Sequence, residues 1–334
     1  MKKITIIMVL SLICGVFLIS CQGENQNYVA EMEDIGSFSF GSLFYTEADE
    51  LIQFEYNGEE VRISYHVEGW GEGIVSEFGW FLFVDGLPQP TRLETKNGGD
   101  FREISYMHDF ALEFRERIEF YVVFTPISGN IGERIGLIAS TILNPSFMPD
   151  DINFPIFGPF HNLSENLPAE LVINSQPIIP YWSSVIATLQ PIPKEILEEE
   201  KSRSDVLDLR FKEFVRMGIF PCGYDFEFRY EGAIFAKDGV ANFSLFAYGG
   251  LEVASRITFF VNHQPIQVND IDFIELQMEH GQMTFVDIEL TLDNLANFNS
   301  LYAVMMTTGE DFHLQHIFKT PTLLLVNEGV EDDV

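Results

Sequence analysis

Apolar and polar residues alternate along much of the chain. Around a turn at Gly58, apolar side chains recur at every second position: Phe54, Tyr56, Val61, Ile63 and Tyr65. Successive side chains of a strand point to opposite faces, so this period of two predicts half-buried β-strands. A helix would scatter the same side chains around its circumference.

Two short apolar runs end in turn residues. Residues 81–84 precede Asp85-Gly86, and residues 258–261 precede Asn262-His263. Each run is typical of a core strand that enters a tight turn, and Pro88 and Pro265 exclude a central strand position just beyond it. Further strands are predicted at 110–116, 118–125, 134–142, 241–247, 284–291, 300–307 and 321–326.

The order of these features occurs twice. Four short matches recur at offsets of about 174 to 181 residues: Tyr56-Asn57-Gly58 with Tyr230-Glu231-Gly232, residues 81–88 with 258–265, residues 112–114 with 288–290, and residues 121–123 with 302–304. We therefore expect an internal duplication.

Many short strands without intervening helices indicate antiparallel β-sandwiches. The predicted fold is mainly β: two tandem antiparallel β-sandwich domains, 36–150 and 224–328, with a proline-rich connector and one helix. In this loose sense the two copies resemble immunoglobulin-like (Ig-like) or fibronectin-III-like domains of tandem surface proteins. The Cys, Trp, Cys set of true immunoglobulin domains is missing, so the strand topology stays open.

Residues 151–223 form the expected connector. Its prolines exclude long regular structure, although residues 169–179 can form one edge strand, and Tyr181 and Trp182 are expected to pack on a domain. A proline start at Pro193 and a glycine stop at Gly218 predict a helix at about 194–217. The helix either braces the two sandwiches or binds a partner.

The amino end has the three zones of an export signal. Lys2 and Lys3 precede an apolar or small run over 4–19, which is shorter than the roughly 20 residues of a spanning helix. It closes with Leu18-Ile19-Ser20-Cys21, which resembles the lipobox of bacterial lipoproteins. The resemblance implies that residues 1–20 are removed and that Cys21 becomes a diacylglyceryl membrane anchor, followed by an acidic tether over 21–35. An ordinary signal peptide, or modification at Cys14, is the alternative.

The mature chain is strongly acidic. Removal of Lys2 and Lys3 leaves 17 basic and 51 acidic side chains, so the formal charge is 17 − 51 = −34, and residues 329–334 form an acidic tail. Such a charge repels nucleic acid, which needs clustered Lys and Arg. It serves either solubility or the binding of a basic partner. With Cys14 removed and Cys21 lipidated, Cys222 is the remaining thiol, so no internal disulfide is expected.

No catalytic motif is found. The sequence lacks the nucleotide-binding glycine patterns, the H-E-x-x-H zinc motif and the G-x-S-x-G nucleophile elbow. We therefore expect a protein that is not an enzyme. Asp270 and Asp272 cluster oxygen donors that suit Ca²⁺, without the spacing of a known calcium loop, and as solvated turn residues they would need no metal.

One loop suits ligand recognition. Glu68-Gly69-Trp70-Gly71-Glu72-Gly73 presents a large aromatic ring between acids, and Tyr248 stands at the comparable place in the second copy. Trp70, Glu68, Glu72 and Tyr248 are therefore candidate ligand-binding residues, with a sugar ring stacked on Trp70. Alternatively, Trp70 plugs the end of its own sandwich.

These observations predict a lipid-anchored protein of the cell envelope, facing outside the cytoplasm, with a non-catalytic binding or assembly role. The partner is a polysaccharide or a protein. The alternatives are a glycan-acting hydrolase, with two carboxylates in a cleft, and an accessory subunit of an envelope transport or surface complex, with an apolar patch.

Overall fold

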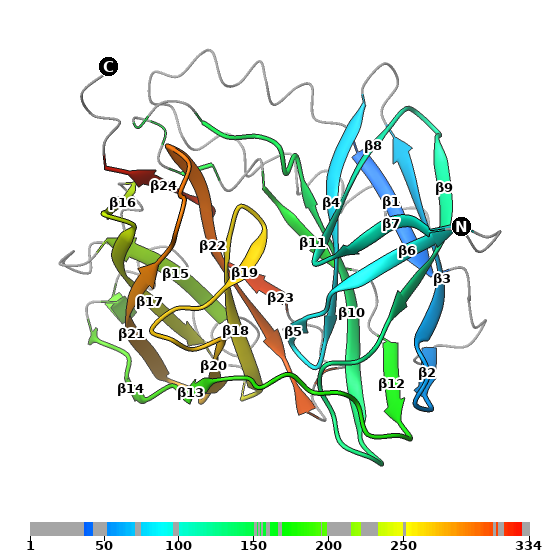
Figure 1. The fold of residues 1–334 in the computed structure, drawn as a ribbon. Coiled ribbons are helices and arrows are strands. Elements are labelled where there is room, and N and C mark those ends of the chain that lie inside the picture. Colours follow the sequence, from blue (N-terminus) through cyan, green and yellow to red (C-terminus); the bar gives the residue numbers. More distant parts are fainter. Residues whose placement is uncertain are drawn as a thin grey trace, which may run out of the picture.

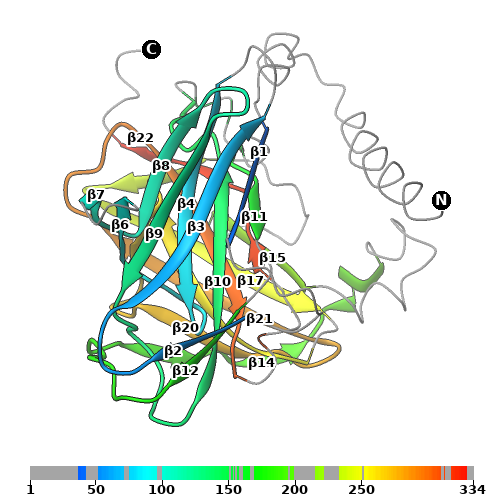
Figure 2. The same cartoon turned by 90° about the vertical axis from the view of Figure 1, so that its right-hand side faces the viewer.

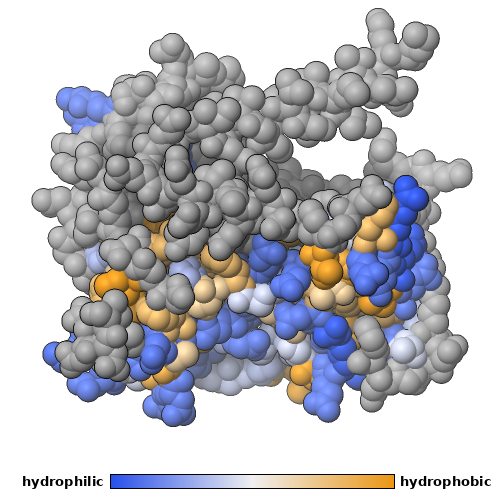
Figure 3. All heavy atoms as spheres, turned by 90° about the horizontal axis from the view of Figure 1, so that it is seen from above, coloured by the Kyte–Doolittle hydropathy of each residue, from blue (hydrophilic) through white to orange (hydrophobic). Residues whose placement is uncertain are grey.

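The chain is mainly β-stranded, as the alternation predicts (Figures 1 and 2). The computed structural model describes residues 37–42, 52–70, 75–95, 100–149, 152, 154, 156–157, 161–165, 169–194, 196–198, 215–221, 233–249, 252–309, 312 and 317–328. The strands fall into a first half, residues 37–173, and a second half, residues 184–327. From above, hydrophilic side chains cover much of the described surface, with smaller apolar patches between them (Figure 3).

Two sheets make up the first half. One contains β1 (Ser37–Ser42), β3 (Val61–Trp70), β9 (Arg117–Phe124), β6 (Thr91–Thr95) and β7 (Asp100–Ser105), in that order. The other contains β2 (Ile52–Tyr56), β12 (Ala169–Ile173), β10 (Arg134–Leu143), β4 (Ser76–Val84) and β5 (Leu87–Pro88). In addition, β8 (Met107–Leu112) pairs with β4, and β11 (Leu163–Glu165) pairs with β10.

An aromatic core lies between these two sheets. The ring of Trp80 on β4 meets Tyr65 on β3 edge to face, with ring centroids 5.3 Å apart. Phe110 on β8 stacks on Phe78 at 5.3 Å and on Phe120 of the opposite sheet at 5.5 Å. Because these side chains are buried, each of them stabilises the packing of one sheet on the other.

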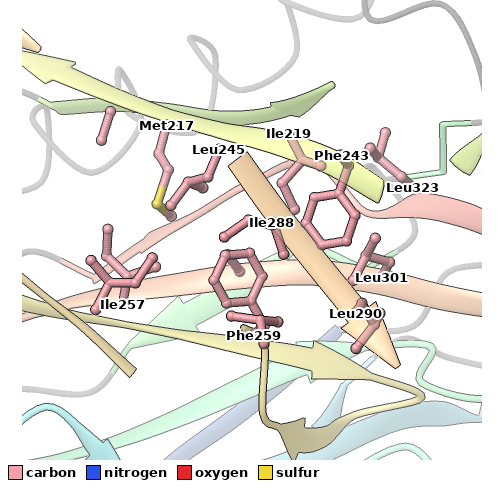
Figure 4. Packing of buried hydrophobic residues seen from close by; sticks show 14 of the residues in the cluster. Met217, Ile219, Phe243, Leu245, Ile257, Phe259, Ile288, Leu290, Leu301 and Leu323 are labelled. Carbon is pink, nitrogen blue, oxygen red and sulfur yellow. The ribbon is translucent and has the colours of Figure 1, made fainter. Parts of the chain in front are cut away.

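The second half is a curled sheet with twelve strands in the described residues. Its order is β13 (Ser184–Ile186), β20 (Phe273–Gln277), β18 (Ala254–Val261), β22 (Phe298–Thr307), β24 (Leu323–Asn327), β16 (Ile234–Lys237), β17 (Val240–Gly249), β21 (Gln282–Thr291) and β14 (Leu189–Pro191). β15 (Val215–Pro221), β19 (Gln264–Ile266) and β23 (Ile317–Lys319) pair with β17, β18 and β22. The sheet curls around an aliphatic and aromatic core that includes Phe243 and Phe259 (Figure 4).

The two halves share one order of strand pairing. In the first half β2 lies parallel to β12, which is followed by β10 and β4; in the second half β16 lies parallel to β24, which is followed by β22 and β18. On the opposite side, β1–β3–β9 corresponds to β15–β17–β21. Even the short strands agree, since β11 pairs with β10 as β23 pairs with β22.

Of the four sequence matches between the halves, only some join strands that are equivalent in the structure. Residues 81–88 and 258–265 do occupy equivalent hairpins, β4–β5 and β18–β19. The match of 121–123 with 302–304 is wrong, because β22 takes the place of β10 and not of β9. The match of 112–114 with 288–290 is wrong for the same reason, since β21 corresponds to β9. Tyr230 lies outside the described residues.

The two equivalent hairpins turn in the same way. Asp85 and Gly86 have φ of 50° and 78°, and Asn262 and His263 have φ of 47° and 64°. Two consecutive residues with positive φ form the two-residue turn whose twist suits a β-hairpin. Asp, Asn and Gly tolerate this backbone, so the turn prediction at these positions is confirmed.

The proline-rich segment takes part in both halves. The predicted edge strand over 169–179 appears as β12, which is not an edge because it pairs with β10 on one side and β2 on the other. β13 and β14, separated by residues 187–188, lie at the two ends of the curled sheet. β14 pairs with β21 in the second half as β6 pairs with β9 in the first half. In the first half this strand comes from between β5 and β9, whereas in the second half it comes from the connector.

The predicted helix is correct only at its start. Residues 196–198 are helical and follow Pro193, whose carbonyl accepts a hydrogen bond from the Leu197 amide. Residues 199–214 lie outside the described residues. The prediction is wrong at 215–217, because this segment begins β15, where Met217 and Ile219 alternate into the core beside β17.

The two halves meet face to face through four strands. On β4 and β10 of the first half and β18 and β22 of the second, alternate side chains leave their own cores and form a shared apolar layer: Phe81, Phe83, Ile138, Ile142, Phe260, Tyr302, Val304 and Met306. Phe260 stands at its centre, with ring centroids 6.0 Å from Phe81, 6.4 Å from Phe83 and 5.2 Å from Tyr302. These strands are buried on both faces, which explains their near-continuous apolar runs.

The contacts around this layer are related by an approximate two-fold symmetry. The Asp85-Gly86 turn packs on the segment after β22, where a side chain at Gly86 would clash with Thr308. The Asn262-His263 turn packs on the equivalent segment after β10, where His263 Nε2 donates to the Pro145 carbonyl at 2.8 Å. Each half thus places its hairpin turn on the same part of the other.

Phe260→Ala tests the importance of this layer. The change removes the ring at its centre and leaves a cavity, so we expect the free energy of unfolding to fall by about 3–5 kcal/mol in chemical denaturation. Phe235→Ala, at an exposed position of β16, serves as the control and should cost less than about 1 kcal/mol. Equal losses in the two variants would contradict the account.

Candidate functional site

A cleft opens where the two halves meet. It has a volume of about 870 Å³. The first half contributes the Asp85 turn and the loop between β9 and β10, the second half contributes Arg256 and the segment after β22, and the connector contributes Ile179 and Trp182. Clefts between domains are common sites of ligand binding because two surfaces converge on one ligand.

An ion pair across the interface fixes one wall of the cleft. Arg256 on β18 donates from one guanidinium nitrogen to both the carbonyl and the Oδ2 of Asp85, each at 2.6 Å. Ser128 donates to the same Oδ2 at 2.8 Å. Because Arg256 and Asp85 belong to different halves and are largely shielded from water, this pair holds the halves in register.

A second arginine lies within the first half. Arg134 at the start of β10 pairs with Glu170 on β12, with 2.9 Å between nitrogen and oxygen. Its side chain is largely exposed, so its donors face the solvent of the cleft. The pair contributes little stability but places planar hydrogen-bonding groups on the cleft surface.

Aromatic rings form the apolar part of the cleft. Trp182 meets Phe273 edge to face at 6.4 Å and donates from its indole nitrogen to the Ile127 carbonyl at 3.3 Å. Phe312, from the second half, lies against Gly136 of β10, where a Cβ atom would come within 2.7 Å of the Phe312 Cβ. The cleft therefore combines fixed rings with charged hydrogen-bonding groups.

Two buried histidines lie at another edge of the interface. The rings of His161 and His263 are 4.9 Å apart. His161 Nε2 donates to the Phe147 carbonyl at 2.9 Å, and His263 Nδ1 lies 3.1 Å from the Tyr302 hydroxyl. Since His263 Nε2 already donates to a carbonyl, the neutral ring accepts at Nδ1 and the Tyr302 hydroxyl is the donor.

A lysine shares this buried region. Lys319 on β23 lies 4.5 Å from the centre of the Tyr302 ring and donates to the Thr322 hydroxyl at 2.6 Å. Burial lowers the pKa of Lys319 to about 7. Burial lowers the pKa of His263 to about 4 and, together with nearby His263 and Lys319, the pKa of His161 to about 3. Both imidazoles are therefore neutral at pH 7.

The loop predicted to bind a sugar is only partly described. Trp70, at the end of β3, is 41% exposed and meets Phe114 edge to face at 6.5 Å. Glu68 lies beside Arg117, with 3.7 Å between oxygen and nitrogen. Glu72 lies outside the described residues. Trp70 thus lies at the surface beside a second aromatic ring, at the end of β3.

Tyr248, the predicted counterpart of Trp70, is not exposed as Trp70 is. It is fully buried and stacks on Phe246 with ring centroids 5.9 Å apart. A ring without accessible surface offers nothing to a ligand, so its predicted binding role is wrong. Burial along β17 is continuous from Phe243 to Gly249, so both faces of that strand are covered.

The predicted calcium ligands are engaged in other ways. Asp272 accepts hydrogen bonds from the Ser183 amide at 2.8 Å and the Ser183 hydroxyl at 2.9 Å through Oδ2, and from Gln267 at 2.9 Å through Oδ1. Asp270 is an exposed turn residue with φ of 59°. Over the described ranges, no three His, Cys, Asp or Glu side chains gather as metal ligands would. Asp272 acts as an anchor for the connector.

The cleft residues carry no local sequence signal. Arg256 and Asp85 are 171 positions apart, and only the packing of the halves brings them together. Trp182 is the exception, because an aromatic residue in a proline-rich connector predicted packing on a domain, which its contact with Phe273 confirms. The same prediction is wrong for Tyr181, which is 94% exposed.

Cys21 and the segment predicted to be an export signal lie outside the described residues. Among the residues that are described, no helix is long and apolar enough to cross a membrane.

The chain matches no protein-family model and no curated protein sequence. Solved structures with some similarity include a protein of unknown function from Porphyromonas gingivalis W83, with 9% identity, coverage of 87% of this chain and 99% of that one, and a TM-score of 0.21. The YadV chaperone has 8% identity, coverage of 84% and 98%, and a TM-score of 0.21. The carboxy-terminal domain of the Streptococcus pyogenes antigen I/II-family protein AspA has 7% identity, coverage of 87% and 99%, and a TM-score of 0.22. Similarity at this level carries no argument about function.

The buried histidines predict an acid-sensitive stability. Their folded pKa values are below the ordinary value of about 6.5, so in this range the unfolded chain binds more protons than the folded chain. The free energy of unfolding should therefore fall as the pH drops from about 6.5 to about 4, and chemical denaturation at pH 7.0, 5.5 and 4.5 measures this loss.

His263→Asn separates this effect from that of the many carboxylates. Asn keeps the positive φ of the turn and cannot titrate, so the loss of stability between pH 7.0 and 4.5 should be smaller than in the wild type. His280→Asn, at an exposed position, is the matched control and should keep the wild-type pH dependence. An unchanged slope in His263→Asn would refute the assignment.

Proposed function

We propose that the protein is a lipid-anchored, non-catalytic binding protein of the cell envelope, and that it binds a polysaccharide in the cleft between two tandem Ig-like domains. The observation that carries this proposal is the cleft itself, where rings from the connector and the second half adjoin ion-paired arginines of both halves.

The strand order supports the Ig-like assignment. An immunoglobulin domain has strands A, B, E and D in one sheet and C, F and G in the other. In the first half, β1–β3–β9–β6 follow the order A, B, E, D, and β4–β10–β12 follow the order C, F, G. Trp80 is buried on the strand that corresponds to C, the position of the core tryptophan in immunoglobulin domains. The second half repeats this order with β14 in the place of D. We propose domain bounds of about 37–173 and 184–327.

The chemistry of the cleft supports a polysaccharide. Sugar rings present apolar faces and many hydroxyl groups, and they need aromatic surface together with fixed donors and acceptors. Trp182 supplies the aromatic surface, Ile179 adds aliphatic surface beside it, and Arg134 with Glu170 supplies donors and acceptors. Of the three described carboxylates that line the cleft, Asp85 and Glu170 are each engaged by an arginine and Glu133 accepts hydrogen bonds from Asn130, which favours binding over the acid–base work of a glycan hydrolase.

Ile179→Glu tests the cleft. The exposed Ile179 lines the cleft, so a carboxylate there should weaken binding at least 10-fold to the best ligand in a panel of polysaccharides and cell-wall fragments. The matched control is Ile178→Glu, since Ile178 is 82% exposed and does not line the cleft. Binding by the soluble chain from residue 22 is measured by titration. Equal affinity in the two variants would contradict the proposed site.

Cys21→Ala tests the anchor. The wild-type chain should incorporate radiolabelled fatty acid in a bacterial host and partition with membranes, because two acyl chains make attachment stable. The alanine variant should incorporate none and keep its signal segment. Labelling of Cys21→Ala, with loss of label in Cys14→Ala, would move the anchor to the other candidate cysteine.

A further inference from the structure

A strip of the connector is apolar and exposed in a chain with a formal net charge of −32. No charged residue occurs between Glu170 and Lys194. Within this stretch Ile178, Tyr181 and Ile186 are 82%, 94% and 73% exposed. Single exposed apolar residues are common, but three of them within nine residues of an extended segment form a contact surface.

The strip includes a strand, β13, that has a partner on only one edge among the described strands. β13 is the first strand of the curled sheet and pairs with β20 on one side (Figure 1). The Ser183 carbonyl and the Ala187 amide point toward β20, where they bond to Asp272 and Glu275 at 2.8 and 2.7 Å. Because backbone groups alternate in direction along a strand, those of Ser184 and Ile186 point to the opposite edge. An incoming strand would find there two amides and two carbonyls in register.

This edge has only one of the usual protections, a short length of three residues. Natural edge strands carry charges, prolines or bulges that prevent pairing with another chain. β13 holds Ser184, Val185 and Ile186, and the nearest prolines, Pro180 and Pro191, lie outside it. The hydrogen bonds from Ser183 to Asp272 hold the segment in place, so an added strand meets a preformed edge.

The charge of the surroundings identifies the kind of partner. Asp270, Asp272 and Glu275 lie next to β13, and the mature chain has a formal charge of −34. A second copy of this chain would bring the same charge and is repelled. A segment with basic side chains is attracted by the acids while its apolar side chains cover Ile186 and Tyr181.

We propose that residues 178–186 are a docking strip for an extended basic segment of a partner protein, which adds as a strand to the outer edge of β13. The strip shares Ile179 and Trp182 with the cleft, but the strand pairing uses the outward backbone groups of Ser184 and Ile186, which do not line the cleft.

The probe is a fluorescent ten-residue peptide of alternating lysine and valine, titrated into the protein and followed by anisotropy. Ile186→Pro removes the outward amide and the isoleucine side chain but keeps the amides that face β20, a change that edge strands tolerate, and should weaken binding at least 10-fold. Ile186→Ala keeps the amide and should weaken binding less. Ile104→Ala, at an exposed isoleucine of β7, should leave binding unchanged.

Two further peptides keep the test independent of the folding of the variants. The same peptide with alternate amides methylated should lose binding to the wild-type protein, because it cannot complete the strand pairing. The peptide with glutamate in place of lysine should not bind. Equal binding of the methylated peptide, equal binding by a folded Ile186→Pro variant, or no saturable binding of the lysine peptide would each overturn the proposal.

Discussion

The arrangement of the molecule depends on the packing of two sheets by their outer faces. β4, β10, β18 and β22 each place one set of alternate side chains in their own core and the other set in the shared layer around Phe260. If the halves separated, Phe81, Phe83 and Phe260 would meet water, at a cost of about 25 cal/mol for each Å² of apolar surface. The halves are therefore held as one body, and the cleft has fixed walls.

The connector strengthens this arrangement because it is built into the sheets. β12 lies between β2 and β10 in a sheet of the first half, and β13 and β14 are the two end strands of the curled sheet of the second half. A chain that is paired on both sides of a junction has little freedom to act as a hinge. Because β13 is the last strand at its end of the described sheet, its outer edge is exposed. The proposed partner segment would pair with the backbone groups of that edge. Binding in the cleft and docking on the strip would then use neighbouring parts of one segment.

Much of the fold follows from local patterns, but the site does not. The alternation of apolar residues identifies most strands, and Asp85-Gly86 and Asn262-His263 identify two hairpin turns, because these are properties of neighbouring residues. The pairing of strands is not local, so matches at 112–114 and 121–123 were assigned to the wrong partners. The sequence predicts a surface ring at Tyr248, but Tyr248 packs with Phe220 and Met283, which lie on other strands and are distant in the sequence. The Arg256–Asp85 pair exists only once the halves have packed.

Residual dipolar couplings of backbone amides report whether the two halves form one rigid body. In a weakly aligned sample, couplings from strands of residues 52–173 and of residues 233–327 should fit one alignment tensor, because both groups tumble as one body through the layer around Phe260. Two tensors of different magnitude would show that the halves move independently. In that case the cleft would have no fixed geometry, and the account of the binding site would fail.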